Sequence, residues 1–194
     1  MKFEYSPGAT PLNFDEMDGL IPLHITNQNQ LNEWEAANIL KAESWIFSIL
    51  NHNNFLTIDF TRLLHKKMFE VTWKWAGLFR STEKNIGITP SLITTALKNL
   101  LEDTVYQIMH SSYSTDEIAY RFHHRLVTIH SFPNGNGRHA RMMTDLLLIQ
   151  TGQPRFTWGN KKLEAESLTR KQYISALKSA DKHDYKPLAA FVRS

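Results

Sequence analysis

The sequence predicts an all-α fold, mainly a helical bundle, with one small β-hairpin flap. Apolar side chains recur at the helical period over most of the 194 residues, and glycine and proline interrupt that pattern at only a few places. Alternation of apolar and polar residues, which is typical of strands, is confined to one aromatic segment. With 42% hydrophobic and 21% charged residues the chain can bury one core, so we expect a single domain.

The first 26 residues predict an irregular N-terminal arm packed on the core, and residues 27–194 predict the single domain. Glycine and proline argue against regular structure in the arm, at Pro7, Gly8, Pro11, Gly19 and Pro22. We expect one short helix there, at Phe14–Met17. Apolar side chains in the segment 12–21 indicate that the arm packs against the domain.

Two helices are predicted in the segment 27–69. Asn27 with Gln30 resembles a capping box, and apolar residues then recur at helical spacing until a polar stretch begins near Asn51. A second amphipathic helix is expected from Asp59 to Phe69, because its apolar residues form one stripe.

The flap is predicted between residues 72 and 88. Aromatic residues are dense around Gly77, a polar stretch follows from Ser81 to Asn85, and Ile86-Gly87-Ile88 comes next. Apolar residues on both sides of a polar tip favour a short hairpin or an extended flap.

The rest of the chain predicts further helices. Thr89 is expected to cap a helix with Pro90 in its first position, and Ser114 with Glu117 forms a capping box for a helix ending at His130. Pro133 and two glycines then interrupt the helical pattern. Three more helices are expected after this break, from about Gly137 to Gly152, from Leu163 to Ala180 and from Tyr185 to Val192.

Composition excludes several classes of protein. The chain has no cysteine, which rules out disulfides, thiolate zinc sites and cysteine nucleophiles. It has no secretory signal and no apolar run near the ~18 residues of a membrane span, so we expect a cytoplasmic protein without membrane contact. Net charge is only +3 and the basic residues are scattered, so no direct nucleic-acid partner is expected.

The loop between two predicted helices has the composition of a phosphate site. Gly135 and Gly137 allow successive N–H groups to point into one concavity at a helix N-terminus, where anions bind. Arg138 and Arg141 lie three residues apart on the first turn, so both guanidinium groups can face one side. His130 ends the preceding helix and can accept a proton at neutral pH. Each feature alone is also compatible with a tight turn or a helix cap, whereas their combination is much less common.

The segment His130–Arg141, HSFPNGNGRHAR, resembles the signature of the Fic family, His-x-Phe-x-[Asp/Glu]-Gly-Asn-Gly-Arg-x-x-Arg. The segments 73–80 and 84–87 are similar to the region that leads to the family's target-positioning flap. The start of the chain, Thr10-Pro11-Leu12 to Gly19-Leu20-Ile21-Pro22, resembles the subgroup called mobile mystery protein B. The resemblance implies a Fic fold for residues 27–194.

This resemblance implies a protein adenylyltransferase, which transfers AMP from ATP to a Ser, Thr or Tyr hydroxyl of a target protein and releases pyrophosphate. His130 would deprotonate the hydroxyl. Arg138 and Arg141 would hold the β- and γ-phosphates, and the α- and β-phosphates would be bound by Gly135, Asn136 and Gly137. The flap would pair with an extended target segment through the backbone of Asn85, Ile86, Gly87 and Ile88.

Asn134 departs from the family signature, which has Asp or Glu at this position to hold magnesium. An amide oxygen can ligate a hard cation, but it brings no negative charge and should bind Mg²⁺ more weakly. Asn134 is therefore a weak candidate for contact with the metal and the nucleotide. Three consequences stay open: the nucleotide's own phosphates hold most of the Mg²⁺, which we favour, another phosphate arrangement is used, or transferase activity has been lost.

Regulation is predicted only by analogy with the family. Many relatives carry a helix Ser/Thr-x-x-x-Glu-Gly/Asn, whose glutamate pairs with the second arginine of the motif. The nearest match here, Phe14–Gly19, lacks the hydroxyl residue and has Asp18 before the glycine. Glu16 and Asp18 are candidates for that inhibitory role, and an ordinary packing turn is the alternative. A small inhibitory partner, as in a toxin–antitoxin pair, is a further implication of the resemblance.

Three functions from different classes follow from these considerations. The first is the adenylyltransferase, and the second is a Fic-type phosphotransferase that uses the same phosphate site. The third is a catalytically silent nucleotide-binding interaction module, for which Asn134 is the main argument.

Overall fold

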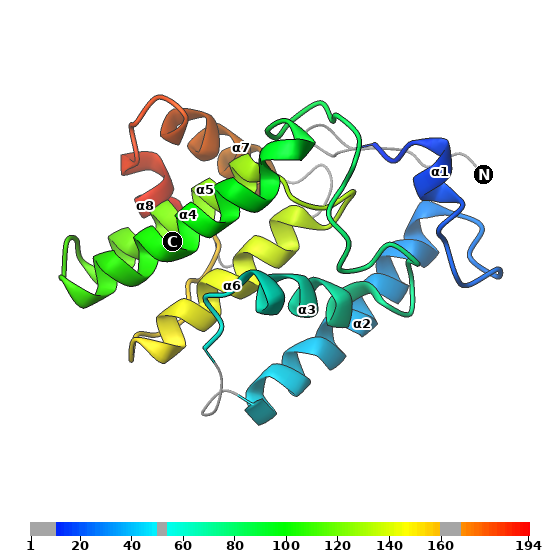
Figure 1. Ribbon diagram of the computed structural model, residues 1–194, viewed down its shortest axis with the longest axis horizontal. Coiled ribbons are helices and arrows are strands. Elements are labelled where there is room, and N and C mark those ends of the chain that lie inside the picture. The colour runs from blue at the N-terminus through cyan, green and yellow to red at the C-terminus, as the bar shows by residue number, and fades with distance from the viewer. Residues whose placement is uncertain (1–10, 50–53, 160–167) are drawn as a thin grey trace.

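The computed structural model of the chain is a helical bundle over its described residues, 11–49, 54–159 and 168–194. This architecture confirms the predicted mainly helical fold (Figure 1). The helices follow one another as α1 (Phe14–Met17), α2 (Gln28–Ile49), α3 (Ile58–Phe69), the 3-10 turn η1 (Pro90–Leu92), α4 (Ile93–Met109), α5 (Thr115–Ile129), α6 (Asn136–Gln150), α7 (Leu168–Ala180) and α8 (Lys186–Val192).

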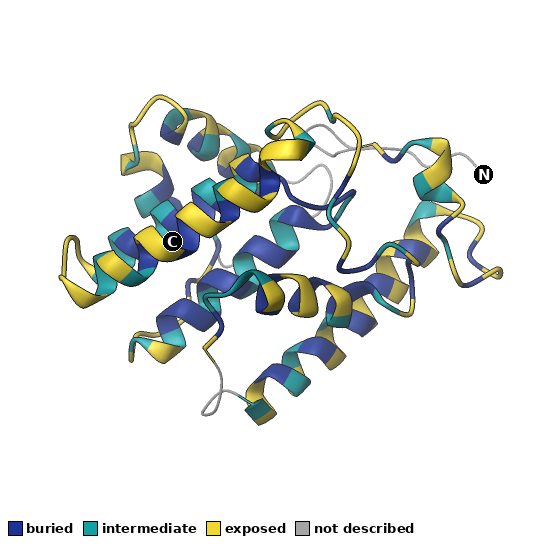
Figure 2. Ribbon diagram, viewed as in Figure 1, coloured by how far each residue is buried: buried dark blue, intermediate teal, exposed yellow. Residues whose placement is uncertain are grey.

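Helices α5 and α6 form the centre of the bundle. Helix α5 packs against α4, α6 and α8, while α2 packs on α3 and α7 packs on α8. Helix α6 has Met143, Leu147 and Leu148 fully buried, whereas the outer side of α4 is exposed (Figure 2). The loop that joins α5 to α6 therefore lies within the packed part of the molecule.

Capping explains where several helices begin. Ser114 accepts a hydrogen bond from the Glu117 N–H at 3.2 Å, as the capping box predicts. Asn27 likewise accepts from the Gln30 N–H at 3.0 Å, but the Gln30 side chain accepts from Thr26 instead of returning to Asn27. The predicted box at α2 is therefore only half formed.

Thr89 occupies the predicted N-cap position with Pro90 after it, but the helix that it precedes is a 3-10 turn and not the α-helix. Thr89 makes no side-chain cap hydrogen bond, and Pro90 opens the 3-10 turn η1. Helix α4 then starts at Ile93. Because the tighter turn lies between Thr89 and α4, the hydroxyl is too far from the first N–H groups of the α-helix to accept from them.

The predicted β-hairpin is not supported by the structure. The described residues contain no strand, and their only β contact is an isolated bridge between Leu20 and Trp73. Residues 78–88 form an irregular extended loop. The Arg80 guanidinium donates to the carbonyl groups of Thr82 and Ile88, so this side chain takes acceptors that a partner strand would otherwise use.

Smaller differences concern the ends of the chain and of helices. Helix α6 begins at Asn136, one or two residues before the predicted start, because Gly135 in the left-handed conformation is its N-cap. Helix α8 begins at Lys186, with Tyr185 as its N-cap. The predicted start of the preceding helix, 163–167, lies outside the described residues, as do residues 1–10 of the arm.

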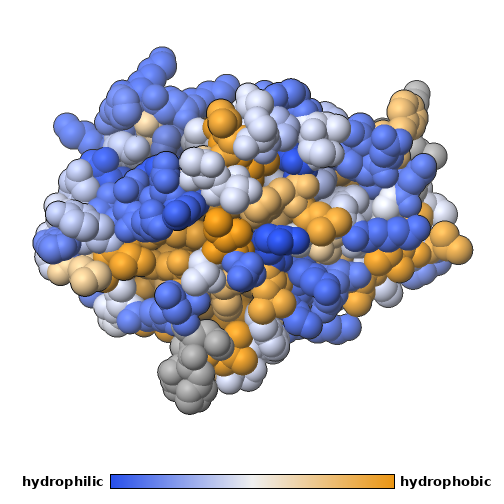
Figure 3. Space-filling model, in the orientation of Figure 1, coloured by the Kyte–Doolittle hydropathy of each residue, from blue (hydrophilic) through white to orange (hydrophobic). Residues whose placement is uncertain are grey.

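The described part of the arm lies against the domain. Leu12 and Ile25 are buried in the core, and α1 forms at the predicted residues with a capping box between Asn13 and Glu16. On one face of the molecule apolar side chains form a band between mainly polar regions (Figure 3). None of the helices in the described ranges combines the length and apolar character that crossing a bilayer requires.

Candidate functional site

The loop from His130 to Gly135 connects α5 to α6 through two residues in the left-handed conformation. His130 has a φ of 54° and is the C-cap of α5, and Gly135 has a φ of 78° and is the N-cap of α6. A residue other than glycine rarely adopts this conformation, and such residues concentrate at functional sites. A side chain on Gly135 would bring its Cβ to 2.6 Å from the Phe69 ring, so only glycine fits there.

Asn136 closes this loop with two hydrogen bonds to a single residue. Its Oδ1 accepts from the Phe132 N–H at 2.9 Å, and its Nδ2 donates to the Phe132 carbonyl at 2.7 Å. Phe132 is fully buried and so anchors the loop in the core. Its ring stacks on His65 with the centroids 3.7 Å apart. The shape of the loop is thus determined by Asn136 above Phe132 and by His65 beneath it.

His65 of α3 supports the loop through both of its ring nitrogens. Nδ1 accepts from the Gly77 N–H at 3.0 Å, so Nε2 carries the proton and donates to the Asn134 carbonyl at 3.0 Å. Complete burial holds the pKa of His65 well below its usual value. The sequence analysis missed this residue, because a histidine in the apolar stripe of α3 gives no signal of which loop it contacts.

His130 is a nearly buried histidine with one ring nitrogen that can act as an acceptor. The residue is 5% exposed, and Nδ1 donates to the Val127 carbonyl at 3.3 Å, which places the ring lone pair on Nε2. Burial, together with a smaller effect of the positive charges of Arg80 and Lys84, lowers the pKa of His130 to about 4. His130 is therefore neutral at pH 7.

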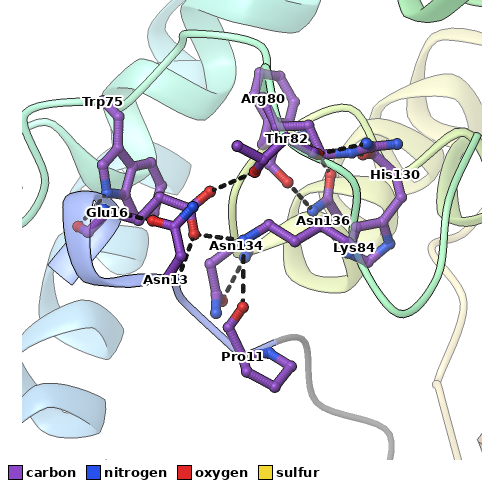
Figure 4. Close-up of polar contacts among 12 residues, drawn as sticks. Pro11, Asn13, Glu16, Trp75, Arg80, Thr82, Lys84, His130, Asn134 and Asn136 are labelled. Carbon is purple, nitrogen blue, oxygen red and sulfur yellow. Dashed lines mark hydrogen bonds and ion pairs between the residues drawn. The ribbon is translucent and has the colours of Figure 1, made fainter. Parts of the chain in front are cut away.

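Arg80 fixes both His130 and the flap residues. Its buried guanidinium donates to the His130 carbonyl at 2.6 Å and to the Ile88 carbonyl, and its backbone N–H donates to the Ser131 carbonyl at 3.0 Å. Figure 4 shows Arg80 between His130 and the loop that carries Thr82. The sequence analysis missed this role because nothing in the local pattern shows that the arginine turns inward.

The predicted flap residues 85–88 lie against His130. A Cβ on Gly87 would stand 2.7 Å from the His130 Cβ and 2.7 Å from the Arg80 guanidinium, and Gly87 has a φ of 110°. This close approach brings the flap backbone next to His130. Ile86 is exposed, and the Ile88 N–H faces the Ile129 carbonyl at 3.5 Å.

The N-terminus of α6 lies beside the same loop. The first regular backbone bond of this helix runs from the His139 N–H to the Gly135 carbonyl at 2.9 Å. The N–H groups of Asn136, Gly137 and Arg138 therefore precede the regular bonding and form the positive end of the helix dipole. A Cβ on Gly137 would meet no atom of the described residues within 4 Å, so folding does not require a glycine there.

Arg138 pairs with a buried carboxylate that the sequence analysis did not single out. Its Nη1 lies 2.6 Å from Oε2 of Glu35, a residue of the buried side of α2, and Oε1 of Glu35 accepts from the Trp73 indole at 2.6 Å. The Arg138 side chain is 32% exposed and lies over the Phe69 ring. Arg138 thus reaches the surface with its charge partly neutralised.

Arg141, three residues further along α6, has a different partner. Its guanidinium is 6.0 Å from the centre of the Tyr173 ring on α7. Burial lowers the pKa of Arg141. Tyr173 raises this pKa, and its effect is larger than the lowering by the positive charge of Arg138. The two predicted phosphate-binding arginines therefore have different partners, Glu35 for Arg138 and Tyr173 for Arg141.

The residues around Asn134 do not fit a metal held by the protein. Asn134 Oδ1 accepts from the Gly135 N–H at 2.6 Å and from Arg138 Nη2 at 3.4 Å, so a cation would meet two donors on this oxygen. Within the ranges described, no group of three or more His, Asp or Glu side chains is placed to hold a metal ion. The two candidates for inhibition lie apart from the arginines, with Glu16 paired to Lys84 and Asp18 exposed at the end of α1.

The fold and the site together describe a helical domain in which a neutral histidine lies between an extended loop and the N-terminus of a helix. Residues 55–148 match the model of the Fic/DOC family. This part of the chain is therefore a Fic/DOC domain, as the resemblance of the motif predicts.

Known proteins and structures are similar to most of this chain. "Protein adenylyltransferase Fic" of Culex quinquefasciatus is 26% identical over 153 residues, which cover 75% of this chain and 28% of that protein. The structure of the N-terminal Fic domain of a VirB-translocated Bep effector from Bartonella quintana has a TM-score of 0.71 at 18% identity. The aligned region covers 92% of this chain and 91% of that one. The structure of BepC from Bartonella tribocorum with bound AMPPNP has a TM-score of 0.65 at 18% identity. The aligned region covers 93% of this chain and 97% of that one.

The buried histidines predict a pH-dependent stability. Burial lowers the pKa of His123 to about 3 and that of His139 to about 4, and His65 also lies well below its usual value. Between these values and about 6.5 the unfolded chain binds protons that the folded chain does not. The histidine contribution is therefore complete above about pH 6.5 and is lost as the pH falls, by up to about 1.4 kcal/mol per pH unit for each histidine.

Urea unfolding at several pH values between 7.5 and 4.5 measures this slope. Burial raises the pKa of Asp145 to about 6, so its contribution to stability changes with pH in the opposite direction to that of a buried histidine. The difference in slope between variants is therefore more informative than the slope of one protein. His139→Gln should flatten the slope, whereas His24→Gln at an exposed position should leave it unchanged. Equal slopes for all three proteins would contradict the buried neutral histidines.

Proposed function

We propose that this chain is a protein adenylyltransferase that transfers AMP from ATP to a Ser, Thr or Tyr hydroxyl of a target protein. The observation that carries the proposal is the neutral His130, held by Arg80 between the flap and the N-terminus of α6. The name of the Culex relative and the AMPPNP bound in the BepC structure support the same chemistry. The match spans only 28% of the length of that relative, so the proposed activity rests on the site that this chain itself contains.

The phosphates are proposed to bind at the start of α6. The N–H groups of Asn136, Gly137 and Arg138 offer donors at the positive end of the helix, and Gly137 has no side chain to obstruct the approach. Arg138 and Arg141 would contact the β- and γ-phosphates. Asn134 and Gly135 border the same loop, where their backbone is held by His65 and by the left-handed turn.

The proposed reaction is an in-line displacement at the α-phosphorus. The target hydroxyl loses its proton to His130 Nε2 as its oxygen forms a bond to phosphorus, and the bond between the α-phosphorus and the bridging oxygen breaks. Pyrophosphate leaves. Phosphate transfer depends mainly on position and charge neutralisation, which the helix N-terminus and the arginines would supply.

The target is proposed to bind along residues 85–88. Residues 85–87 are exposed next to His130 and are not part of a strand, so an extended peptide could add along them. Mg²⁺, if it accompanies ATP, would be held by the phosphates. A cytoplasmic setting, a small inhibitory partner of the toxin–antitoxin kind and membership of the mobile mystery protein B subgroup are proposed on the family resemblance alone.

The alternatives use the same loop with a different outcome. A Fic-type phosphotransferase would place another phosphorus in line with the nucleophile. A silent nucleotide-binding module would bind ATP without transfer, and the neutral Asn134 is the residue in its favour.

Labelled ATP tests the proposal directly. The chain is incubated with ATP labelled at the α- or the γ-phosphate, with a lysate as the source of targets, and label on protein bands is recorded. Label from the α position only is the expected result. Label from γ would favour the phosphotransferase, and absence of both labels with retained ATP binding would favour the silent module.

His130→Ala should abolish α-label transfer and leave ATP affinity nearly unchanged, because the imidazole acts only in the chemical step. His183→Ala, at an exposed position far along the chain, is the matched control and should transfer label normally. A large loss of ATP affinity in His130→Ala would overturn the assignment of His130 as the base.

Asn134→Asp should raise Mg²⁺ dependence and transfer activity, since a carboxylate supplies the charge that the amide lacks. The measurement is the rate of α-label transfer against Mg²⁺ concentration. An unchanged Mg²⁺ profile would show that position 134 does not contact the metal.

Glu35→Gln should strengthen binding of an ATP analogue, because the carboxylate no longer competes with phosphate for Arg138. We expect roughly a three- to tenfold lower Kd in a fluorescence titration, given that the pair is partly exposed. Glu43→Gln on the same helix, which removes the exposed pair with Arg155, is the control and should have no effect. Weaker binding in Glu35→Gln would mean instead that Glu35 orients Arg138 for the phosphates.

A further inference from the structure

Helix α1 is held to the domain by polar contacts and by one partly buried apolar side chain, Met17. None of its residues is buried, and Phe14 is 83% exposed. The Trp75 indole donates to the Glu16 carbonyl at 2.9 Å, and a Cβ on Gly19 would stand 2.7 Å from the Trp75 ring. The arm therefore lies very close to the segment that leads into the flap.

Glu16 connects this helix to the flap. One of its carboxylate oxygens forms an ion pair with Lys84 and also accepts from the Asn13 N–H at 2.8 Å. The other oxygen accepts from the Thr82 hydroxyl at 3.4 Å. Figure 4 shows Glu16 facing Lys84 and Thr82. A single carboxylate thus joins α1 to two residues of the loop before 85–88.

The ion pair is largely removed from water. The side chain of Lys84 is 5% exposed and that of Glu16 is 11% exposed. Lys84 Nζ also donates to the Pro11 carbonyl at 3.2 Å, so the arm surrounds the ammonium group with acceptors. Removing one partner from such a pair leaves a buried charge without compensation, whereas an exposed pair would contribute little.

Lys84 is also coupled to the reacting group. It lies one residue before the proposed target-binding segment, and its positive charge acts on His130. The far end of that segment is fixed independently, by Arg80 at the Ile88 carbonyl and by the approach of Gly87 to His130. The Glu16–Lys84 pair therefore holds the near end of the segment, and Arg80 holds the far end.

We propose that Glu16 and Lys84 form a latch between the N-terminal arm and the flap, and that they are positioning residues for the target-binding segment 85–88. This assignment rests on the proposed function in that it takes this segment to be the target site. The nucleotide loop has its own supports in His65 and Asn136, neither of which contacts Glu16 or Lys84 in the described structure. Figure 4 shows Asn134 of the nucleotide loop beside Lys84, so we expect opening of the latch to affect the target side of the site more than the nucleotide side.

Hydrogen exchange of the intact chain tests the latch without any need for transfer activity. Glu16→Gln keeps an acceptor for Asn13 and removes the charge, and Lys84→Met keeps the aliphatic stem. Each should speed amide exchange in residues 82–88 by roughly fivefold or more, while exchange in α5 and α6 stays unchanged. Asp15→Asn, an exposed acid on the same helix, is the control and should have no effect. Unchanged exchange in both latch variants would overturn the proposal.

The double exchange Glu16→Lys with Lys84→Glu separates a latch from a general loss of stability. Restored protection of 82–88 in the double variant supports a direct pair, because either single exchange places like charges together. If the double variant exchanges as fast as the single ones, or if the single variants speed exchange in α5 and α6 as much as in residues 82–88, the two residues have a structural role only and the proposal fails.

Transfer measurements then relate the latch to function. Glu16→Gln should slow α-label transfer to protein bands severalfold at saturating ATP, while the KM for ATP stays within about twofold. A raised KM for ATP with unchanged flap exchange would contradict the latch. A wild-type chain that transfers no label would contradict the proposed function, and the exchange result would still decide whether the latch exists.

Discussion

The hydrogen bonds of His65 are the constraint on which the site depends. This one imidazole accepts from Gly77, donates to Asn134 and stacks on Phe132, so three segments far apart in the sequence meet at a single ring. Both bonds require the neutral ring with its proton on Nε2, and complete burial keeps the ring neutral. The loop position in turn determines where His130 stands and where α6 begins.

The site is assembled from buried polar groups that each have a specific partner. Arg80 is surrounded by backbone carbonyl groups, Glu35 bridges Trp73 and Arg138, and Asn136 binds both backbone groups of Phe132. Burying such groups costs free energy unless the geometry of their partners is good. A change in any one partner therefore displaces the loop or the flap instead of causing a local adjustment.

The sequence predicted what is encoded locally. Helical period and capping located α5, α1 and most of the other helices, and the motif located the loop with His130 and its glycines. Contacts between distant segments were not predictable. Glu35 occupies a regular position in the buried stripe of α2, and only the fold shows that Arg138 is opposite. The hairpin prediction failed because the Arg80 side chain, not a second strand, binds the flap carbonyls.

Asn134 and the pair between Glu35 and Arg138 belong to one electrostatic arrangement. Asn134 Oδ1 lies 3.4 Å from Arg138, while Glu35 lies 2.6 Å from the same guanidinium. A carboxylate at position 134 would add a second negative charge beside Arg138 and compete with Glu35 for it. With the neutral amide, Arg138 is left to Glu35, and the loop has no acid that would attract a cation. The replacement therefore changes the partner of Arg138 as well as the affinity for a metal, so a change at either position should alter the effect of a change at the other.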